Sequence, residues 1–146
     1  MVEHLLAIDD VADDFEKILR WAIEFKRAWK NGDDVAQNFF PLDTLAIGSI
    51  YEKPSTRTRV SFEVGIIRLG GYSLTLLNND IQLRKSESFF DTANVLSRFL
   101  GGITYRCFAH ADVSELAENA DVPVINALSD KHHPCQAAAD LMTIIE

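Results

Sequence analysis

Residues that commonly bind anions stand together in one short segment of the chain. They are Ser55, Thr56, Arg57, Thr58 and Arg59. They follow an almost unbroken apolar run at 44–51, and a helical pattern begins at Thr58. The first turn of a helix offers unpaired backbone N–H groups and partial positive charge, which attract anions. The hydroxyls add donors and the guanidinium fork of Arg57 suits phosphate, so this turn is predicted to be an anion site.

Each part of the turn also has a purely structural interpretation. Ser55 or Thr56 could serve only as the N-cap of the following helix. Arg59 could form an ion pair with Glu52 or Glu63. The combination of hydroxyls, arginine and a helix start after a buried strand favours anion binding over simple capping.

Polar residues also follow other predicted strands. A loop at 78–88 carries Gln82 and the basic residues Arg84 and Lys85, and on its own it resembles an ordinary solvated loop. Arg106 stands near the end of a strand, where it needs solvent or an anionic partner, and an ion pair with an acidic neighbour is the alternative. Because ligands of open α/β sheets bind at the carboxyl ends of the strands, these residues are candidates for the same site.

The segment 129–136 follows the last predicted strand and contains His132, His133, Cys135 and Gln136. A metal site is a weak interpretation, because adjacent histidines tend to point apart and no second ligand pair stands at the right spacing. A polarising or hydrogen-bonding role is preferred for His133. No metal is therefore expected.

Strand and helix patterns alternate through most of the chain. Apolar runs predict strands at 44–51, 72–77, 103–108 and 122–126, and amphipathic patterns predict helices at 9–30, from 58 to the glycines at 70–71, and at 88–100, 112–119 and 134–146. This order predicts an α/β fold, a three-layer αβα domain with a mainly parallel four-stranded sheet flanked by helices. We expect one domain over residues 1–146.

The composition excludes several classes of function. A chain of 146 residues suffices for one globular domain, and a net charge of −8 argues against nonspecific nucleic-acid binding. No apolar run approaches the length of a membrane span and the start lacks the pattern of a signal peptide, so a cytoplasmic protein is expected. Cys107 and Cys135 lie far apart without CxxC spacing and are expected to be free thiols.

The last predicted helix still presents apolar residues where the sequence stops, namely Leu141, Ile144 and Ile145, and no capping residue follows. A domain rarely ends in this way. We therefore expect the chain to be part of a longer protein, in which the helix from Pro134 leads to a second domain.

The segment Glu52–Glu63, EKPSTRTRVSFE, resembles the carbamoyl-phosphate motif of the aspartate and ornithine carbamoyltransferases. Further segments continue the resemblance in order over nearly the whole chain, at 69–71, 80–83, 87–88, 91–93, 95–98, 122–126 and 133–136. Lys53 before the proline, the sequence DIQL at 80–83 and Cys135 favour the ornithine branch of the family. Arg84 and Ser86 stand where the ornithine enzymes commonly have glycine.

The resemblance implies a role for individual residues in binding carbamoyl phosphate. Those implied to contact it are Ser55, Thr56, Arg57, Thr58, Gln82, Arg106, His133, Pro134, Cys135 and Gln136. The turn 55–58 and Arg106 would hold the phosphate, and Gln136 would bind the carbamoyl amino group. Gln82 would reach the site of an adjacent subunit, which implies a homotrimer or a multiple of trimers. Arg57, Thr58, Arg106 and His133 are the implied catalytic residues.

The implied reaction transfers a carbamoyl group to the side-chain amine of ornithine, giving citrulline and phosphate. Arg57, Thr58 and His133 would stabilise negative charge on the carbonyl oxygen, and no metal or organic cofactor is needed. The chain would be the carbamoyl-phosphate-binding half, inactive alone, with the ornithine-binding domain beyond Glu146. Two alternatives stay open: transfer to another amine (aspartate, putrescine or an acylated ornithine), and a fragment that only binds phosphate and trimerises.

Overall fold

The computed structural model describes residues 3–146, without the side chains of Val35 and Ala36. Its centre is a four-stranded sheet in the order β2-β1-β3-β4, and each neighbouring pair of strands is parallel. The strands are β1 (Ala46–Tyr51), β2 (Tyr72–Leu77), β3 (Gly102–Arg106) and β4 (Val124–Leu128). The predicted α/β class with a parallel sheet is confirmed.

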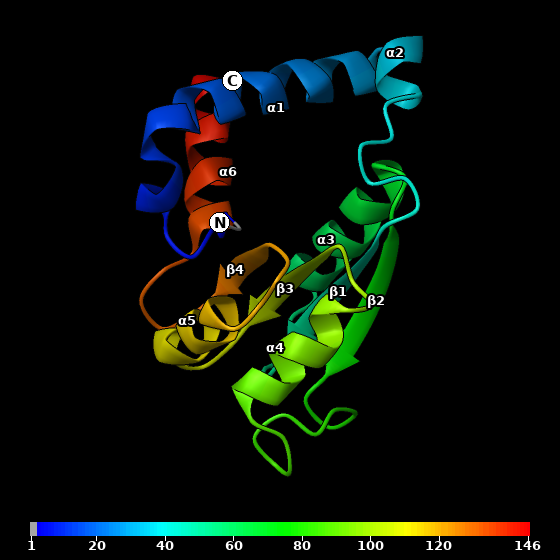
Figure 1. Cartoon of the computed structure of the whole chain (residues 1–146). Helices are drawn as coiled ribbons and strands as arrows, with labels where there is room; N and C mark the ends of the chain where they lie inside the picture. Colours follow the sequence, from blue (N-terminus) through cyan, green and yellow to red (C-terminus); the bar gives the residue numbers. More distant parts are fainter. Residues whose placement is uncertain (1–2) are drawn as a thin grey trace.

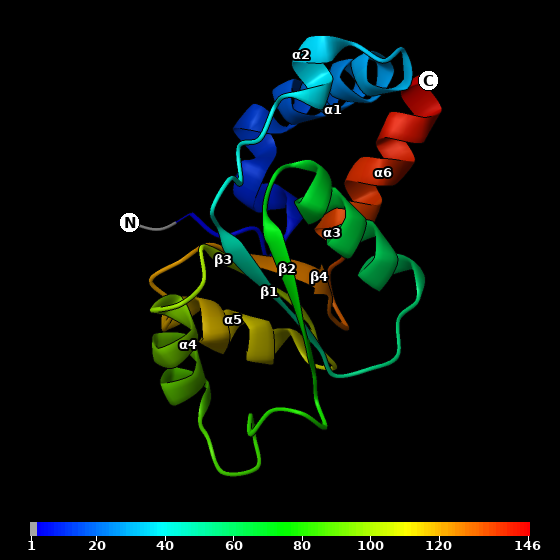
Figure 2. The same ribbon diagram turned by 90° about the vertical axis from the view of Figure 1, so that its right-hand side faces the viewer.

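Helices cover both faces of the sheet (Figures 1 and 2). They are the 3-10 helix η1 (Ile8–Asp14) and the α-helices α1 (Phe15–Lys30), α2 (Asp34–Gln37), α3 (Arg57–Arg68), α4 (Phe89–Ser97), α5 (His110–Glu118) and α6 (Pro134–Ile145). α4 and α5 lie together on one face, and α3 lies over β1 and β2 on the other. α6 rises from the end of β4 and contacts α1, which crosses at a distance from the sheet. Within residues 3–146, no helix is both long and apolar enough to cross a membrane.

The tightest core lies between the sheet and the layer of α4 and α5. Its buried members are Ile50, Leu83, Phe89, Ala93, Leu100, Ile103, Tyr105, Cys107, Val113, Leu116, Ala117, Ala120 and Val124. β1 is buried along almost its whole length, as its apolar run predicted. The buried core therefore lies mainly on this side of the sheet.

The first predicted helix, 9–30, is divided in the structure. Residues 8–14 form the 3-10 helix η1, in which Val11 has non-helical backbone angles, and the regular helix starts only at Phe15. The carboxylate of Asp10 accepts hydrogen bonds from the backbone N–H groups of Leu6 (2.6 Å) and Ala7 (2.8 Å). This local capping by an acidic side chain competes with a regular first turn. The short helix α2 was not predicted.

Three apolar residues that recur at helical spacing on α3 face outward. Val60, Val64 and Ile67 are 53%, 40% and 63% exposed, and the buried residue of α3 is Ile66. The helical period was correct, but α3 rests on the sheet through a neighbouring face. An apolar stripe shows that a helix is amphipathic and does not by itself show which protein surface covers it.

Gly70 ends α3 with a backbone φ of +88°, in the left-handed region that favours glycine. A Cβ at this position would lie 2.7 Å from the Cβ of Phe40. By contrast, a Cβ on Gly65 in the middle of α3 would meet nothing within 4 Å. The two glycines thus form a matched pair.

Gly70→Ala should lower the free energy of unfolding by about 2 kcal/mol, because it combines an unfavourable φ with a steric clash. Gly65→Ala should raise it by up to about 1 kcal/mol, because alanine is the better helix former. Urea unfolding followed by circular dichroism measures both. Equal effects of the two substitutions would contradict this description of the turn.

Candidate functional site

The carboxyl edge of the sheet gathers the polar residues singled out from the sequence. β1 ends at Tyr51, and a turn leads from Glu52 to the start of α3 at Arg57. The backbone N–H of Glu52 donates to the carbonyl of Arg106 (3.0 Å), so the turn leaves the sheet beside the end of β3. The turn therefore begins next to Arg106, which the sequence had predicted to join the site.

The hydroxyls at the start of α3 are not used to cap it. Thr56 is the N-cap residue, but no side-chain capping bond is formed, and the carbonyl of Thr56 accepts the helical bond from Val60 (3.0 Å). The side chain of Ser55 makes no hydrogen bond with any described residue. The simple capping interpretation thus fails here, and both hydroxyls, together with the N–H groups of the first turn, are available to a ligand.

The two arginines of the turn differ in their surroundings. Arg59 forms an ion pair with Glu63 (2.9 Å), and the carboxylate of Glu63 also accepts a hydrogen bond from Thr75. Arg57 is exposed, and its side chain forms no ion pair or hydrogen bond with the described residues. The ion pair with Glu63 that was the alternative role for Arg59 is confirmed. Arg57, by contrast, retains a guanidinium group free to bind an anion.

Thr58, Arg106 and His133 meet across three elements. One guanidinium nitrogen of Arg106, Nη1, donates to the hydroxyl of Thr58 (3.2 Å). The charge of Arg106 is close enough to His133 to contribute to its pKa shift. Within the described residues, Arg106 Nε and His133 Nδ1 are buried without a hydrogen-bond partner. Buried polar atoms without partners are uncommon, and an acceptor from a ligand would satisfy the Nε–H group of Arg106.

A network around Asn126 builds the loop that presents His133. The buried Asn126 amide donates to the carbonyl of Leu6 (2.8 Å), the Ser129 hydroxyl (3.2 Å) and the carbonyl of His132 (3.1 Å). Ser129 also accepts from the backbone N–H of His132 (3.1 Å). His133 is therefore held at the N-terminus of α6 by its neighbours.

The imidazole of His133 is uncharged at neutral pH. Burial lowers its pKa below the ordinary value of 6.5, and the positive charge of Arg106 lowers it further. A neutral imidazole donates one hydrogen bond and accepts one. His133 can thus interact with a polar ligand atom without adding a second charge beside Arg106.

The remaining predicted residues have more varied positions. Pro134 is buried at the first turn of α6, and burial raises the pKa of the Cys135 thiol, which stays protonated. Gln136 is exposed, and its amide donates to Asp140 on the same helix (2.7 Å). Gln82 is exposed on the loop after β2, where Ser86 donates to its side chain (3.2 Å). The backbone N–H of Gln136 donates to the carbonyl of His133 (3.1 Å), but among the described residues neither glutamine side chain forms a hydrogen bond with Thr58, Arg106 or His133.

Two residues of this edge had no site role in the sequence-based prediction. Lys53 lies with its ammonium group 5.0 Å from the centre of the Phe108 ring, and it lines a polar pocket of about 380 Å³ with Ser55 and Thr56. Glu52 has a side chain only 4% exposed and links the ends of β1 and β3. An acidic residue directly after a buried strand was the available signal for Glu52.

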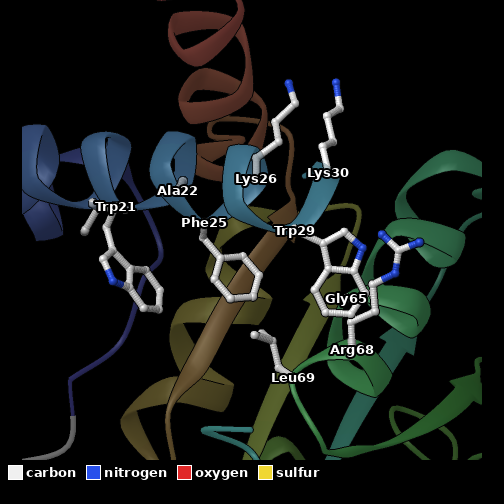
Figure 3. Close-up of a pocket in the computed structure, with 10 residues that line it drawn as sticks. Trp21, Ala22, Phe25, Lys26, Trp29, Lys30, Gly65, Arg68 and Leu69 are labelled. Atoms are coloured by element: carbon white, nitrogen blue, oxygen red, sulfur yellow. The ribbon is translucent and has the colours of Figure 1, made fainter. Parts of the chain in front are cut away.

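A larger hollow lies elsewhere and differs in chemistry. A groove of about 580 Å³ separates α1 from α3, and the aromatic side chains of Trp21, Phe25 and Trp29 line it (Figure 3). Its polar lining groups are cationic, and the Arg68 guanidinium lies 5.2 Å from the centre of the Trp29 ring. None of its lining residues is an aspartate, glutamate, histidine, cysteine, serine or threonine, so the candidate site is the polar edge of the sheet. Within residues 3–146, no cluster of three or more His, Cys, Asp and Glu could hold a metal ion.

Comparison with known proteins points to one family for the chain. Residues 3–146 match the model of the aspartate/ornithine carbamoyltransferase carbamoyl-P binding domain. The ornithine carbamoyltransferase of Anoxybacillus flavithermus is 46% identical over 144 residues, which is 99% of this chain and 45% of that protein. That of Thermococcus kodakarensis is 49% identical over 138 residues, 94% of this chain and 42% of the relative.

Solved structures that are similar to this chain are also ornithine carbamoyltransferases. The ornithine carbamoyltransferase from Pyrococcus furiosus superposes with a TM-score of 0.91 at 48% identity, over 97% of this chain and 44% of that one. The enzyme from Burkholderia thailandensis gives 0.89 at 39% identity, over 97% of this chain and 48% of that one. The chain therefore spans less than half the length of these relatives.

The lowered pKa of His133 makes the stability of the fold depend on pH. Below about 6.5 the unfolded chain binds a proton at this residue that the folded chain resists, so the free energy of unfolding should fall as the pH drops from 7.5 to 5.5. His133→Gln removes this contribution, and its stability should decline less steeply. Urea unfolding at both pH values is the measurement, and an equally steep decline in His133→Gln would refute the assignment.

Proposed function

Since this chain belongs to the aspartate and ornithine carbamoyltransferase family, as a carbamoyl-phosphate-binding domain, we propose that it binds carbamoyl phosphate at the polar edge of its sheet. The observation that carries the proposal is the set of unsatisfied groups gathered there. Arg106 Nε and His133 Nδ1 are buried without a partner among the described residues. The Arg57 guanidinium and the Ser55 and Thr56 hydroxyls, in the turn whose Thr58 contacts Arg106, form no hydrogen bond with the described residues. A phosphate with an attached carbonyl supplies acceptors for several of these donors.

Each group has a distinct part in the proposal. The first turn of α3, with Ser55, Thr56 and Arg57, holds the phosphate oxygens, and Arg106 binds them from β3. Arg57, Thr58 and the neutral His133 contact the carbonyl oxygen of the ligand. Gln136 binds the carbamoyl amino group through its amide oxygen, since its amide nitrogen is the atom that donates to Asp140. Pro134 and Cys135 complete the wall of the site.

The reaction that we propose follows from these placements. An uncharged amine attacks the carbamoyl carbon, and negative charge develops on the carbonyl oxygen, where Arg57, Thr58 and His133 stabilise it. The bond from carbon to the phosphate oxygen then breaks, and the phosphate leaves into the cationic turn with the proton that the attacking nitrogen releases. Most of the acceleration comes from positioning and electrostatics, without a metal or organic cofactor.

Ornithine is the amine that we propose, because the sequence relatives and solved structures named above are ornithine carbamoyltransferases. The products are citrulline and phosphate. The chain spans under half of those relatives, so the groups that bind ornithine belong to a part of the protein outside residues 1–146. We also propose a homotrimer, in which the exposed Gln82 enters the site of a neighbouring subunit. Aspartate, putrescine or an acylated ornithine is the alternative acceptor.

The two arginines of the turn provide a matched test of the anion site. Arg57→Ala should weaken the binding of inorganic phosphate roughly 10- to 100-fold, because it removes charge-assisted hydrogen bonds to the ligand. Arg59→Ala removes the same charge two residues away. Arg59 also lines the pocket beside Ser55 and Thr56, but it is paired with Glu63, so phosphate affinity should fall less than in Arg57→Ala. Isothermal titration calorimetry measures both. Equal losses, or no binding by the unmodified chain, would remove the proposal.

The acceptor is tested by product analysis. A longer form with a second domain like that of the relatives should make citrulline from carbamoyl phosphate and ornithine, whereas the 146-residue chain alone should make none. Mass spectrometry of reactions with ornithine, aspartate, putrescine and acylated ornithine separates the possible products. A different carbamoylated product without citrulline would exclude ornithine, and turnover by the short chain would exclude the need for a second domain.

A further inference from the structure

The carboxylate of Glu52 connects the segments that carry the anion-binding groups. Its Oε1 accepts a hydrogen bond from the Tyr105 hydroxyl (2.8 Å), and its Oε2 accepts one from the backbone N–H of Phe108 (2.9 Å). The backbone N–H of Glu52 donates to the carbonyl of Arg106 (3.0 Å). Tyr105 precedes Arg106 in the sequence and Phe108 follows it, so Glu52 is bonded to the chain on either side of Arg106. The position of Arg106 relative to the turn therefore depends on where the Glu52 carboxylate lies.

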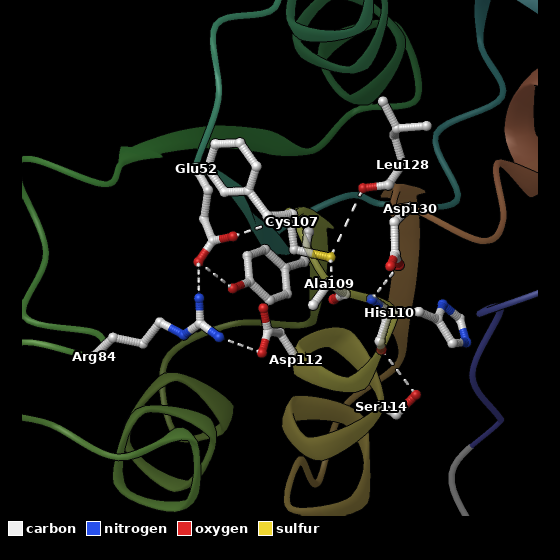
Figure 4. A network of polar contacts seen from close by, with 11 residues as sticks. Glu52, Arg84, Cys107, Ala109, His110, Asp112, Ser114, Leu128 and Asp130 are labelled. Carbon is white, nitrogen blue, oxygen red and sulfur yellow. Dashed lines mark hydrogen bonds and ion pairs between the residues drawn. The ribbon is translucent and has the colours of Figure 1, made fainter.

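A second buried carboxylate lies close by, and one arginine reaches both (Figure 4). The side chains of Glu52 and Asp112 are 4% and 8% exposed. Arg84 Nη1 lies 3.6 Å from Glu52, and Arg84 Nη2 lies 2.5 Å from Asp112. The guanidinium also lies 5.5 Å from the centre of the Phe89 ring. Within residues 3–146, the ion pairs of both carboxylates are formed with Arg84 alone, so without it two buried negative charges would lack a cation.

The backbone of Arg84 is held in an uncommon conformation. Its φ is +64°, in the left-handed region, which is unfavourable for a residue with a long side chain. The neighbouring backbone is fixed, because the carbonyl of Gln82 accepts from the N–H groups of Lys85, Ser86 and Glu87 at 2.9–3.2 Å. Leu83, 1% exposed, anchors the same turn in the core. A side chain that keeps two ion pairs compensates for such a backbone.

From these contacts we propose that Arg84 is a positioning residue of the anion site. It fixes the Glu52 carboxylate, which in turn holds Arg106 against Thr58 and the start of α3. This inference rests on the proposed function and deepens it, because Arg84 itself touches no ligand. It assigns a role to the loop between β2 and α4 within its own subunit, separate from that of Gln82.

Arg84→Gly is the most direct test, because glycine relieves the left-handed backbone while it removes both ion pairs. We expect inorganic phosphate to bind about five- to tenfold more weakly to this variant, and Arg84→Lys to give an intermediate loss, because lysine keeps the charge without the fork. Arg98→Ala is the control, since Arg98 is 74% exposed and lies 4.0 Å from Asp121. It should leave the affinity unchanged. NMR titration with phosphate resolves weak dissociation constants, and circular dichroism checks folding.

A double substitution separates positioning from a general effect on the fold. If Arg84 acts through Arg106, Arg84→Gly should weaken binding no further once Arg106→Ala is present. Losses that multiply in the double variant, or wild-type affinity in Arg84→Gly, would overturn the inference while leaving the anion site intact. Should Arg84→Gly fail to fold, Arg84→Lys serves in the same cycle. If the unmodified chain binds no phosphate, the proposed function fails, and this inference fails with it.

Discussion

Glu52 places a carboxylate with 4% exposure between the ends of β1 and β3, and the polar edge of the sheet is arranged around it. A buried carboxylate is stable only when its oxygens are well satisfied. Here a tyrosine hydroxyl and a backbone N–H at the end of β3, and an arginine from the loop after β2, satisfy them. The requirement to satisfy one charge thus brings β1, β3 and the loop after β2 into a fixed relation. Burial also raises the pKa of Tyr105, which keeps its hydroxyl available as a donor.

The local charge at this edge is opposite to that of the whole chain. The net charge is −8, yet Lys53 and Arg57 lie within a few residues of the start of α3, and Arg106 of β3 donates a hydrogen bond to Thr58 there. The acidic groups nearby are already committed, since Glu52 pairs with Arg84 and Glu63 with Arg59. Cations therefore remain for a ligand because the carboxylates have other partners. A small anion is attracted to this edge, whereas a long polyanion such as a nucleic acid would meet a predominantly negative surface.

The arrangement of strands and helices followed from the sequence, because buried parallel strands give apolar runs and their crossover helices give a helical period. The position of the anion turn after β1 followed for the same reason. The separate roles of Arg57 and Arg59 followed only in part, because the sequence offered both Glu52 and Glu63 as partners of Arg59. The structure pairs Arg59 with Glu63 on the same helix and Glu52 with Arg84. The outward direction of Val60 and Val64 and the place of α1 away from the sheet are set by tertiary packing. Local sequence patterns do not contain that information.

The groove between α1 and α3 has a practical consequence for anyone who follows this protein by spectroscopy. The chain contains two tryptophans, Trp21 and Trp29, and both side chains line that groove. Intrinsic tryptophan emission is therefore a local signal from α1, and no tryptophan lines the polar pocket at the edge of the sheet. A molecule that enters the groove would alter the emission, while occupation of the turn after β1 would leave it nearly constant. Tryptophan fluorescence thus reports on the groove between α1 and α3 and responds little to events at the polar edge.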